Sequence, residues 1–257
     1  MAKDTSEDPN SVKAKIEWPS APSTLSMQAG AVHVWAWNYH FSAESLKRYI
    51  SLLSPEECLR MQRFHFERDR IQYAVCHAVL RIVLGQYIGL PPSSFCFDQN
   101  EFGRPHLAPP AAASGLTFNL SHTRHIALLA IATGITLGVD VEQIHPIESG
   151  LVEQYFSSRE QTALKALEGE DWLKGFYNCW TRKEAILKAE GNGLKVRLDA
   201  FDVSLNPKEQ ATVLGVRAGA GLISNWHLTE LQPAPGFVGA LATDAPPANV
   251  IRYRFEG

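Results

Sequence analysis

Three side chains at a spacing of four residues could do chemistry together on one face of a predicted helix. They are Trp180, Glu184 and Lys188. Good helix formers fill residues 180–190, and Gly191 follows where a left-handed C-terminal cap belongs. The spacing places an indole, a carboxylate and an ammonium on successive turns. Taken alone, Glu184 and Lys188 would be an ordinary ion pair on a solvated helix face.

A second stretch, residues 136–142, supplies two more carboxylates. It is rich in β-branched residues and alternates as a strand does, which sends Asp140 and Glu142 to one face and Val139 to the other. Two like charges side by side repel, so a strand tolerates them in open solvent or around a cation. Carboxylates together with substrate phosphate oxygens are ligands that suit Mg²⁺. Asp140, Glu142 and a third acid such as Glu184 would therefore make a plausible magnesium site.

These stretches resemble the paired signature of the 4′-phosphopantetheinyl transferases, in the variant with Lys-Glu-Ala in the second motif. The first motif is Gly-Val-Asp-Val-Glu at 138–142, and the second is Trp-Thr-Arg-Lys-Glu-Ala-Ile-Leu-Lys-Ala-Glu-Gly at 180–191. Between residues 101 and 123 lie Glu-Phe-Gly-Arg-Pro, a loop rich in Pro and Ala, and Phe-Asn-Leu-Ser-His-Thr. The resemblance covers roughly residue 31 to the C-terminus and points to the two-lobed, Sfp-like branch of the family.

The resemblance implies transfer of the phosphopantetheine arm of coenzyme A to a serine of an apo acyl or peptidyl carrier protein, leaving adenosine 3′,5′-bisphosphate. Asp140, Glu142 and Glu184 would bind Mg²⁺, Lys188 would bind the phosphates and offset charge on the leaving group, and Glu184 is the candidate base. Two alternatives stay open. A metal-dependent phosphoesterase or pyrophosphatase could use the same acids with water, and a non-enzymatic coenzyme A-binding protein could use the basic groups alone.

For the nucleotide part of coenzyme A, the resemblance implies further binding residues. Arg60 matches a position where the family is expected to have a Lys or Arg that binds the 3′-phosphate. Arg104 follows the Gly of the Gly-Arg-Pro turn, where a basic residue would contact the nucleotide. Ser121 and His122 lie in the Asn-Leu-Ser-His motif, where an imidazole could donate to a phosphate oxygen.

Other residues of the second motif are expected to have supporting roles. Trp180 is interpreted as a packing residue that fixes the helix. Arg182 and Lys183 lie off the face of Glu184, which favours contact with solvent or with the carrier protein. An apolar patch with basic neighbours at 156–165 could dock that partner.

Composition restricts the functional class of the protein and its cellular compartment. The chain has 257 residues and a net charge of −3, which argues against a general nucleic-acid or membrane-surface binder. Its four cysteines lack Cys-x-x-Cys or zinc-ligand spacing, and the N-terminus has no apolar core of a signal peptide. We therefore expect a cytoplasmic protein. Within the family that the chain resembles, its length is that of the two-lobed branch, which implies a monomer.

The pattern of elements predicts an α+β fold with two similar halves in a pseudo-twofold arrangement, each an antiparallel sheet with packed helices. Residues 1–30 are expected to be a mobile tail, 31–145 an N-terminal half and 146–257 a C-terminal half. Helices are predicted at 42–53, from 54 onward, at 67–87, at 160–167 and from a cap at Asp171 to 190. Capping boxes are expected at 54–57 and 157–160. Residues 126–132 and 135–142 are expected to form an antiparallel pair.

Overall fold

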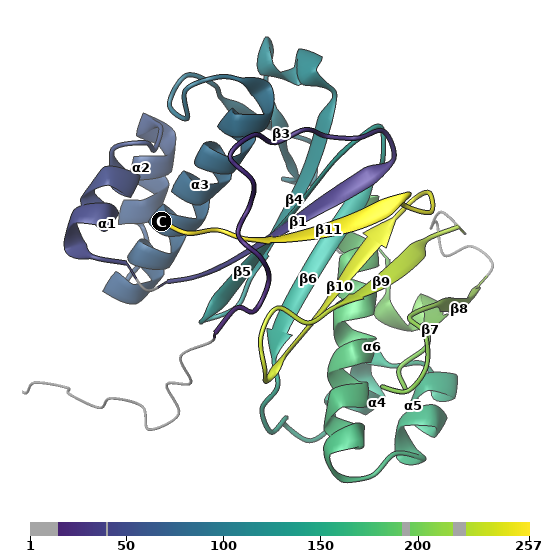
Figure 1. Cartoon of the computed structure of the whole chain (residues 1–257). Coiled ribbons are helices and arrows are strands. Elements are labelled where there is room, and N and C mark those ends of the chain that lie inside the picture. Colours follow the sequence, from purple (N-terminus) through teal and green to yellow (C-terminus); the bar gives the residue numbers. More distant parts are fainter. Residues whose placement is uncertain (1–14, 40, 192–195, 218–224) are drawn as a thin grey trace, which may run out of the picture.

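Two sheets meet face to face, and helices cover the outer face of each (Figure 1). This computed structural model describes residues 15–39, 41–191, 196–217 and 225–257. The described residues form six α-helices and a set of mainly antiparallel strands, which confirms the predicted α+β class. The order of layers from one side to the other is helices, sheet, sheet, helices.

The first lobe is built on a four-stranded sheet in the order β11-β1-β5-β4. Its strands and the helices that cover it are β1 (Ala31–Asn38), β4 (Leu116–His122), β5 (Ile126–Thr133), β11 (Asn249–Arg254), α1 (Ala43–Ile50), α2 (Pro55–Gln62) and α3 (Glu67–Ile88). The strands β1 and β11 are parallel, and the other pairs are antiparallel. A small ribbon of β2 (Phe97–Gln99) and β3 (Pro105–Leu107) and a 3-10 turn at Ala111–Ser114 connect α3 to β4.

The second lobe is built on a three-stranded antiparallel sheet in the order β6-β10-β9. Its elements are β6 (Leu137–Gln143), β9 (His227–Leu231), β10 (Phe237–Thr243), α4 (Leu151–Tyr155), α5 (Ser158–Lys165) and α6 (Gly169–Glu190). A 3-10 turn at Leu198–Ala200 leads into a second small ribbon, β7 (Phe201–Val203) with β8 (Val213–Val216). The long helix α6 lies on the outer face of the second sheet, because its buried side chains pack against the face of β10 that points away from the first sheet.

The order of the strands along the chain does not match their order in the sheets. The predicted pair of 126–132 with 135–142 is wrong: β5 pairs with β1 and β4, whereas β6 crosses to the second sheet and pairs with β10. The last strand, β11, returns to lie beside β1 (Figure 1). Each expected half, 31–145 and 146–257, thus contributes a strand to the sheet of the other.

Residues 15–30, expected to belong to a mobile tail, are packed against the body of the protein. Ile16 and Trp18 are buried between the sheets, and the Trp18 indole N–H donates to the carbonyl of Gln232 at 3.1 Å. Ser20 forms an isolated parallel β-bridge with Arg254, the last residue of β11. Residues 1–14 of the predicted tail lie outside the described part of the chain.

Local sequence signals explain where the helices begin and end. Capping boxes at Ser54 and Ser157 start α2 and α5 as predicted, with the hydroxyl accepting from the backbone N–H three residues on. Gly191 ends α6 in the left-handed region with φ 65°. The start of α6 differs from the prediction, because the helix begins at Gly169 and Asp171 lies in its first turn rather than at its cap.

Three apolar clusters hold the layers together. One fills the space between the two sheets, the second lies between the first sheet and α1–α3, and the third lies between the second sheet and α4–α6. By length and composition alone α3 could cross a membrane, but its middle is buried against the first sheet, as in the core helix of a soluble fold. The clusters leave the ends of β4, β6 and α6 as the place where polar groups of both lobes meet.

Candidate active site

Asp140 on β6 is at the centre of a polar cluster that joins the two lobes. Its Oδ1 accepts from Lys188 Nζ of α6 at 2.6 Å and from Ser121 Oγ of β4 at 2.9 Å. Lys188 Nζ also donates to Ser121 Oγ at 2.9 Å, which closes a triangle. Asp140 Oδ2 is buried and has no hydrogen-bond partner among the described residues. This oxygen is an unused acceptor that points to a ligand.

The two other predicted acids lie near Asp140 and feel its charge. Burial and repulsion from Asp140 raise the pKa of Glu142 to about 7, although Lys188 opposes the effect. Burial and the same carboxylate raise the pKa of Glu184. These shifts indicate a crowded set of carboxylates whose negative charge the Lys188 ammonium only partly offsets. Among the described residues, however, no three acidic, His or Cys side chains already stand as a closed ligand cluster.

The predicted face of α6 is confirmed. Trp180, Glu184 and Lys188 are half-buried in a helix whose neighbouring positions are mostly fully buried, so this stripe is the side that reaches open space. Trp180 packs against the rings of Tyr155 and Phe176, in line with its interpretation as a packing residue. Glu184 and Lys188 are therefore presented together at the junction of the lobes.

A glycine lets β6 approach α6 closely enough to bring these groups together. A Cβ atom on Gly138 would collide with the Ala185 carbonyl and the Ala189 N–H, so only glycine fits there. Gly138 lies two residues before Asp140, on the strand face that carries both acids. The opposite face carries Val139 and Val141 into the core between the sheets, as the alternation predicts.

Strand alternation also separates Ser121 from His122. Ser121 is buried and faces Asp140 and Lys188, and Asn119 on the same face accepts from the backbone N–H of Val139 at 2.8 Å. His122 faces α3, where Gln72 contacts its Nδ1 at 3.1 Å. The predicted pair of binding residues thus serves two places: Ser121 supports the acid and lysine, whereas His122 lines a cavity.

That cavity, of about 480 Å³, lies between α2, α3 and β4. Arg60 of α2 and His122 of β4 both line it. The Arg60 guanidinium lies 6.0 Å from the centre of the Tyr73 ring. Desolvation and, to a smaller extent, the positive charge of Lys188 lower the pKa of His122, although a backbone hydrogen bond opposes the shift. At neutral pH the cavity therefore offers a guanidinium, an aromatic face and a neutral imidazole.

Arg104 makes a different set of contacts from the expected one. Its guanidinium donates to the carbonyl of Leu137 at 2.7 Å and to that of Ala189. It thereby ties the loop before β3 to the start of β6 and the end of α6. Arg104 also lines a cavity of about 250 Å³ together with Glu184 and Lys188, so its predicted contact with the nucleotide stays a prediction.

The two cavities are neighbours. Pro105 and Asn119 line both of them, so the space beside Arg60 and His122 continues toward Glu184 and Lys188. On the other side of the acids, Glu142 borders a hollow of about 330 Å³ whose lining includes the apolar side chains of Phe176 and Trp180. A ligand with an anionic half and an apolar half could lie across the acids.

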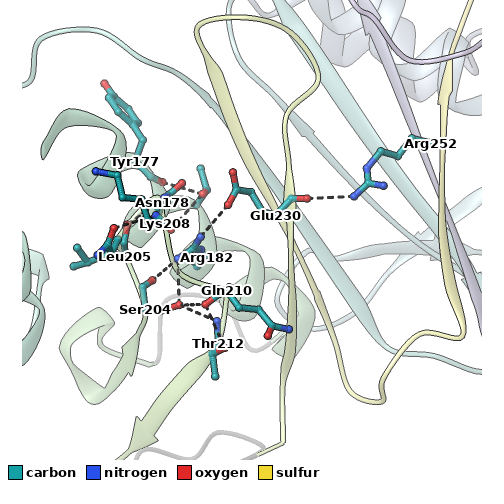
Figure 2. A network of polar contacts seen from close by, with 12 residues as sticks. Tyr177, Asn178, Arg182, Ser204, Leu205, Lys208, Gln210, Thr212, Glu230 and Arg252 are labelled. Carbon is teal, nitrogen blue, oxygen red and sulfur yellow. Dashed lines mark hydrogen bonds and ion pairs between the residues drawn. The ribbon is translucent and has the colours of Figure 1, made fainter. Parts of the chain in front are cut away.

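The expectation that Arg182 and Lys183 contact solvent or a partner is wrong. Both are buried, at 1% and 0% exposed. Arg182 donates to the carbonyl of Ser204 at 2.6 Å and pairs with Glu230, as Figure 2 shows. They point away from the junction and hold the second lobe together, because α6 is covered on that side by the segment after it.

The predicted apolar docking patch at 156–165 is also wrong. Phe156 and Leu164, its large apolar residues, are buried in the core of the second lobe, and so is Glu160. Arg159 and Lys165 remain exposed. An amphipathic helix shows its apolar face to the core, and the pattern therefore described packing rather than a docking surface.

Sequence reasoning gave no role to Asn119, Tyr73 or Gln72. Asn119 stands inside the Asn-Leu-Ser-His motif, where period two from Ser121 could have placed it on the same face. Tyr73 and Gln72 carried no such signal, because their importance comes from the packing of α3 against the end of β4.

The site has the parts of an enzyme that transfers a phosphoryl group. Neighbouring acids, a lysine paired with one of them and an adjoining cavity lined by Arg60 and His122 can together bind phosphates and stabilise the charge that develops in the transfer.

Comparison with known proteins agrees with this class. The family model described as 4′-phosphopantetheinyl transferase superfamily matches residues 136–242, and one described as 4′-phosphopantetheinyl transferase, N-terminal, matches residues 36–134. The chain is 34% identical to the 4′-phosphopantetheinyl transferase HetI of Nostoc sp., over 88% of this chain and 92% of that protein. It is 29% identical to the 4′-phosphopantetheinyl transferase Sfp of Bacillus subtilis, over 67% of this chain and 75% of Sfp. The chain belongs to the 4′-phosphopantetheinyl transferase superfamily.

Proposed function

We propose that this enzyme transfers the 4′-phosphopantetheine arm of coenzyme A to a serine of an apo acyl or peptidyl carrier protein. The serine oxygen forms a bond to the β-phosphorus, the bond from that phosphorus to the bridging oxygen breaks, and adenosine 3′,5′-bisphosphate leaves. Family membership supports the reaction. The observation that carries the assignment of the site is the Asp140–Lys188–Ser121 triangle beside Glu142 and Glu184.

The donor set fits a divalent cation. Asp140 Oδ2 is a buried oxygen with no partner among the described residues, and the raised pKa values of Glu142 and Glu184 reflect carboxylates that positive charge would stabilise. We assign Asp140, Glu142 and Glu184 as the residues that would hold Mg²⁺. When bound, this ion would neutralise the pyrophosphate.

We assign Lys188 to the same phosphates. Its side chain is 30% exposed, so the ammonium is held by Asp140 and Ser121 yet still reaches the cavity beside Glu184. An ammonium at this position stabilises negative charge that grows on the leaving phosphate. Glu184, which lines the same cavity, is the proposed base that accepts the serine proton.

The adjoining cavities suggest how coenzyme A lies. We place its 3′-phosphate near Arg60 and His122, because these groups line the larger cavity. The apolar hollow beside Glu142 suits the pantetheine arm. Since β4, β6 and α6 of a single chain supply the site, we propose that the enzyme acts as a monomer; its cytoplasmic location stays a prediction.

The test is to follow coenzyme A and nucleotide products by chromatography, with and without an apo carrier protein, in Mg²⁺ and after its removal by a chelator. The proposal predicts adenosine 3′,5′-bisphosphate only when carrier and Mg²⁺ are both present. Nucleotide release without carrier would instead support the hydrolase, and turnover that persists in chelator would refute the assignment of Mg²⁺.

A further inference from the structure

Gln72 on α3 makes contacts that bear on the chemistry of His122. Its Nε2 donates to the backbone carbonyl of Thr123, just after β4, and lies 3.1 Å from Nδ1 of His122. A third contact, to the Tyr39 hydroxyl, is longer at 3.4 Å. The amide group therefore spans the end of β4 from the side of the first helical layer.

The orientation of this amide follows from its partners. The Thr123 carbonyl can only accept a hydrogen bond, so the NH₂ group of Gln72 must face it, because the reverse orientation would set two oxygens against each other. Of the two other partners, His122 Nδ1 at 3.1 Å is nearer than the Tyr39 hydroxyl at 3.4 Å, so we assign the second hydrogen of the same NH₂ group to His122 Nδ1. An amide nitrogen cannot accept a hydrogen bond, so Nδ1 must be the acceptor.

This assignment fixes the tautomer of the imidazole. With Nδ1 accepting, the proton of neutral His122 is carried on Nε2. His122 is exposed and lines the cavity beside Arg60, and its ring therefore presents an N–H donor to that space. A donor suits a phosphate oxygen, whereas the other tautomer would present a lone pair and repel it.

We propose that Gln72 is a positioning residue that holds His122 as the Nε2–H tautomer for an anionic oxygen of the substrate. This inference rests on the proposed function, in which His122 contacts the 3′-phosphate of coenzyme A. Gln72 does not touch the substrate in this account and acts through His122.

The first test reads the tautomer directly and needs no substrate. Long-range ¹H–¹⁵N NMR of histidine-labelled protein, with His122 assigned from the His122→Ala variant, should show a proton on Nε2 and none on Nδ1. In Gln72→Met, which keeps the length but removes the donor, the pattern of His122 should change. A wild-type proton on Nδ1 would overturn the proposal.

The second test is a double-mutant cycle on the KM for coenzyme A. Gln72→Met should raise KM about tenfold, as expected for a weakened hydrogen bond to a charged group, with kcat changed much less. In a His122→Ala background the same substitution should add less than about twofold, because it acts through the imidazole. Gln86→Met, the same substitution at an exposed position of α3, is the matched control.

The outcomes separate this inference from the proposed function. Multiplicative effects of Gln72→Met and His122→Ala would show that Gln72 only supports the fold, and would overturn the positioning role. An unchanged KM in His122→Ala would refute the contact of His122 with the phosphate, while the NMR result would still decide the bond between Gln72 and the ring.

Discussion

Lys183 offers a sharp test of the packing of α6. The side chain is fully buried, and its Nζ donates to the carbonyls of Leu198 and Phe201 at 2.6 Å each and pairs with Glu160 at 2.8 Å. Lys183→Met keeps an unbranched side chain as far as Cε, lacks the ammonium group and so removes all three contacts. The Glu160 carboxylate would still accept hydrogen bonds from the backbone N–H groups of Ser157 and Val203, but it would have lost the Lys183 ammonium.

The expected loss can be worked out from these contacts. Removal of one partner of a buried ion pair costs about 3–5 kcal/mol, because the remaining charge stays buried without compensation. The two orphaned carbonyls add to the cost, and apolar packing of the methionine offsets part of it. We expect a loss of about 4 kcal/mol in the free energy of unfolding, or roughly 10 °C in the melting temperature for a chain of this size.

The assay is thermal and urea unfolding of the wild type, Lys183→Met and Lys165→Met. Lys165 is an exposed lysine of α5 and serves as the matched control, with a change of less than about 0.5 kcal/mol expected. Adding Glu160→Gln to Lys183→Met should cost less than the sum of the single effects, because it removes the uncompensated charge. Equal, small losses at Lys183 and Lys165 would refute the burial of Lys183 and favour the solvent contact expected from the sequence.

Three more perturbations test other parts of the account. Gly138→Ala should abolish transfer and lower stability by more than about 2 kcal/mol, since its methyl group would separate β6 from α6; near-normal activity would show that the close approach is not needed. Burial alone would raise the pKa of Glu57, but hydrogen bonds from His77, Arg81 and Ser54 outweigh it and lower that pKa to about 2. The ionised Glu57 carboxylate therefore stabilises the folded state by about 3 kcal/mol above pH 4.5, and this contribution is lost as the pH falls from 4.5 to 2. In Glu57→Gln the free energy of unfolding should depend less on pH over this range than in the wild type. The same pH dependence in both proteins would contradict the lowered pKa. Arg104→Met should cost about 1–3 kcal/mol through the carbonyls of Leu137 and Ala189 that it leaves unpaired; unchanged stability with a raised KM for coenzyme A would instead favour the contact with the nucleotide.

Local features of the sequence predicted local structure well. Capping boxes at Ser54 and Ser157, the cap at Gly191 and the shared face of Glu184 and Lys188 were all confirmed, because each depends on residues within one or two turns. The alternation of β6 placed Asp140 on the face opposite Val139 for the same reason.

Features set by contacts between distant segments could not be predicted in this way. The pairing of β6 with β10 and of β11 with β1 depends on strands far apart in the chain, for which the sequence contains no register signal. The burial of Lys183 depends on the turn at 198–200 and on Glu160, neither of which a helical wheel includes. Gln72 matters only because the end of β4 lies beside α3.

The central claim is that the acids and the lysine at the junction of the lobes carry out the transfer. It is tested most directly by the intact mass of an apo acyl carrier protein after incubation with coenzyme A, Mg²⁺ and either the wild type, Glu184→Gln or Glu170→Gln. We predict the addition of one phosphopantetheine by the wild type and by Glu170→Gln, a control at an exposed acid in the first turn of α6, and at least a hundredfold slower addition by Glu184→Gln. Equal rates for all three proteins would contradict the account.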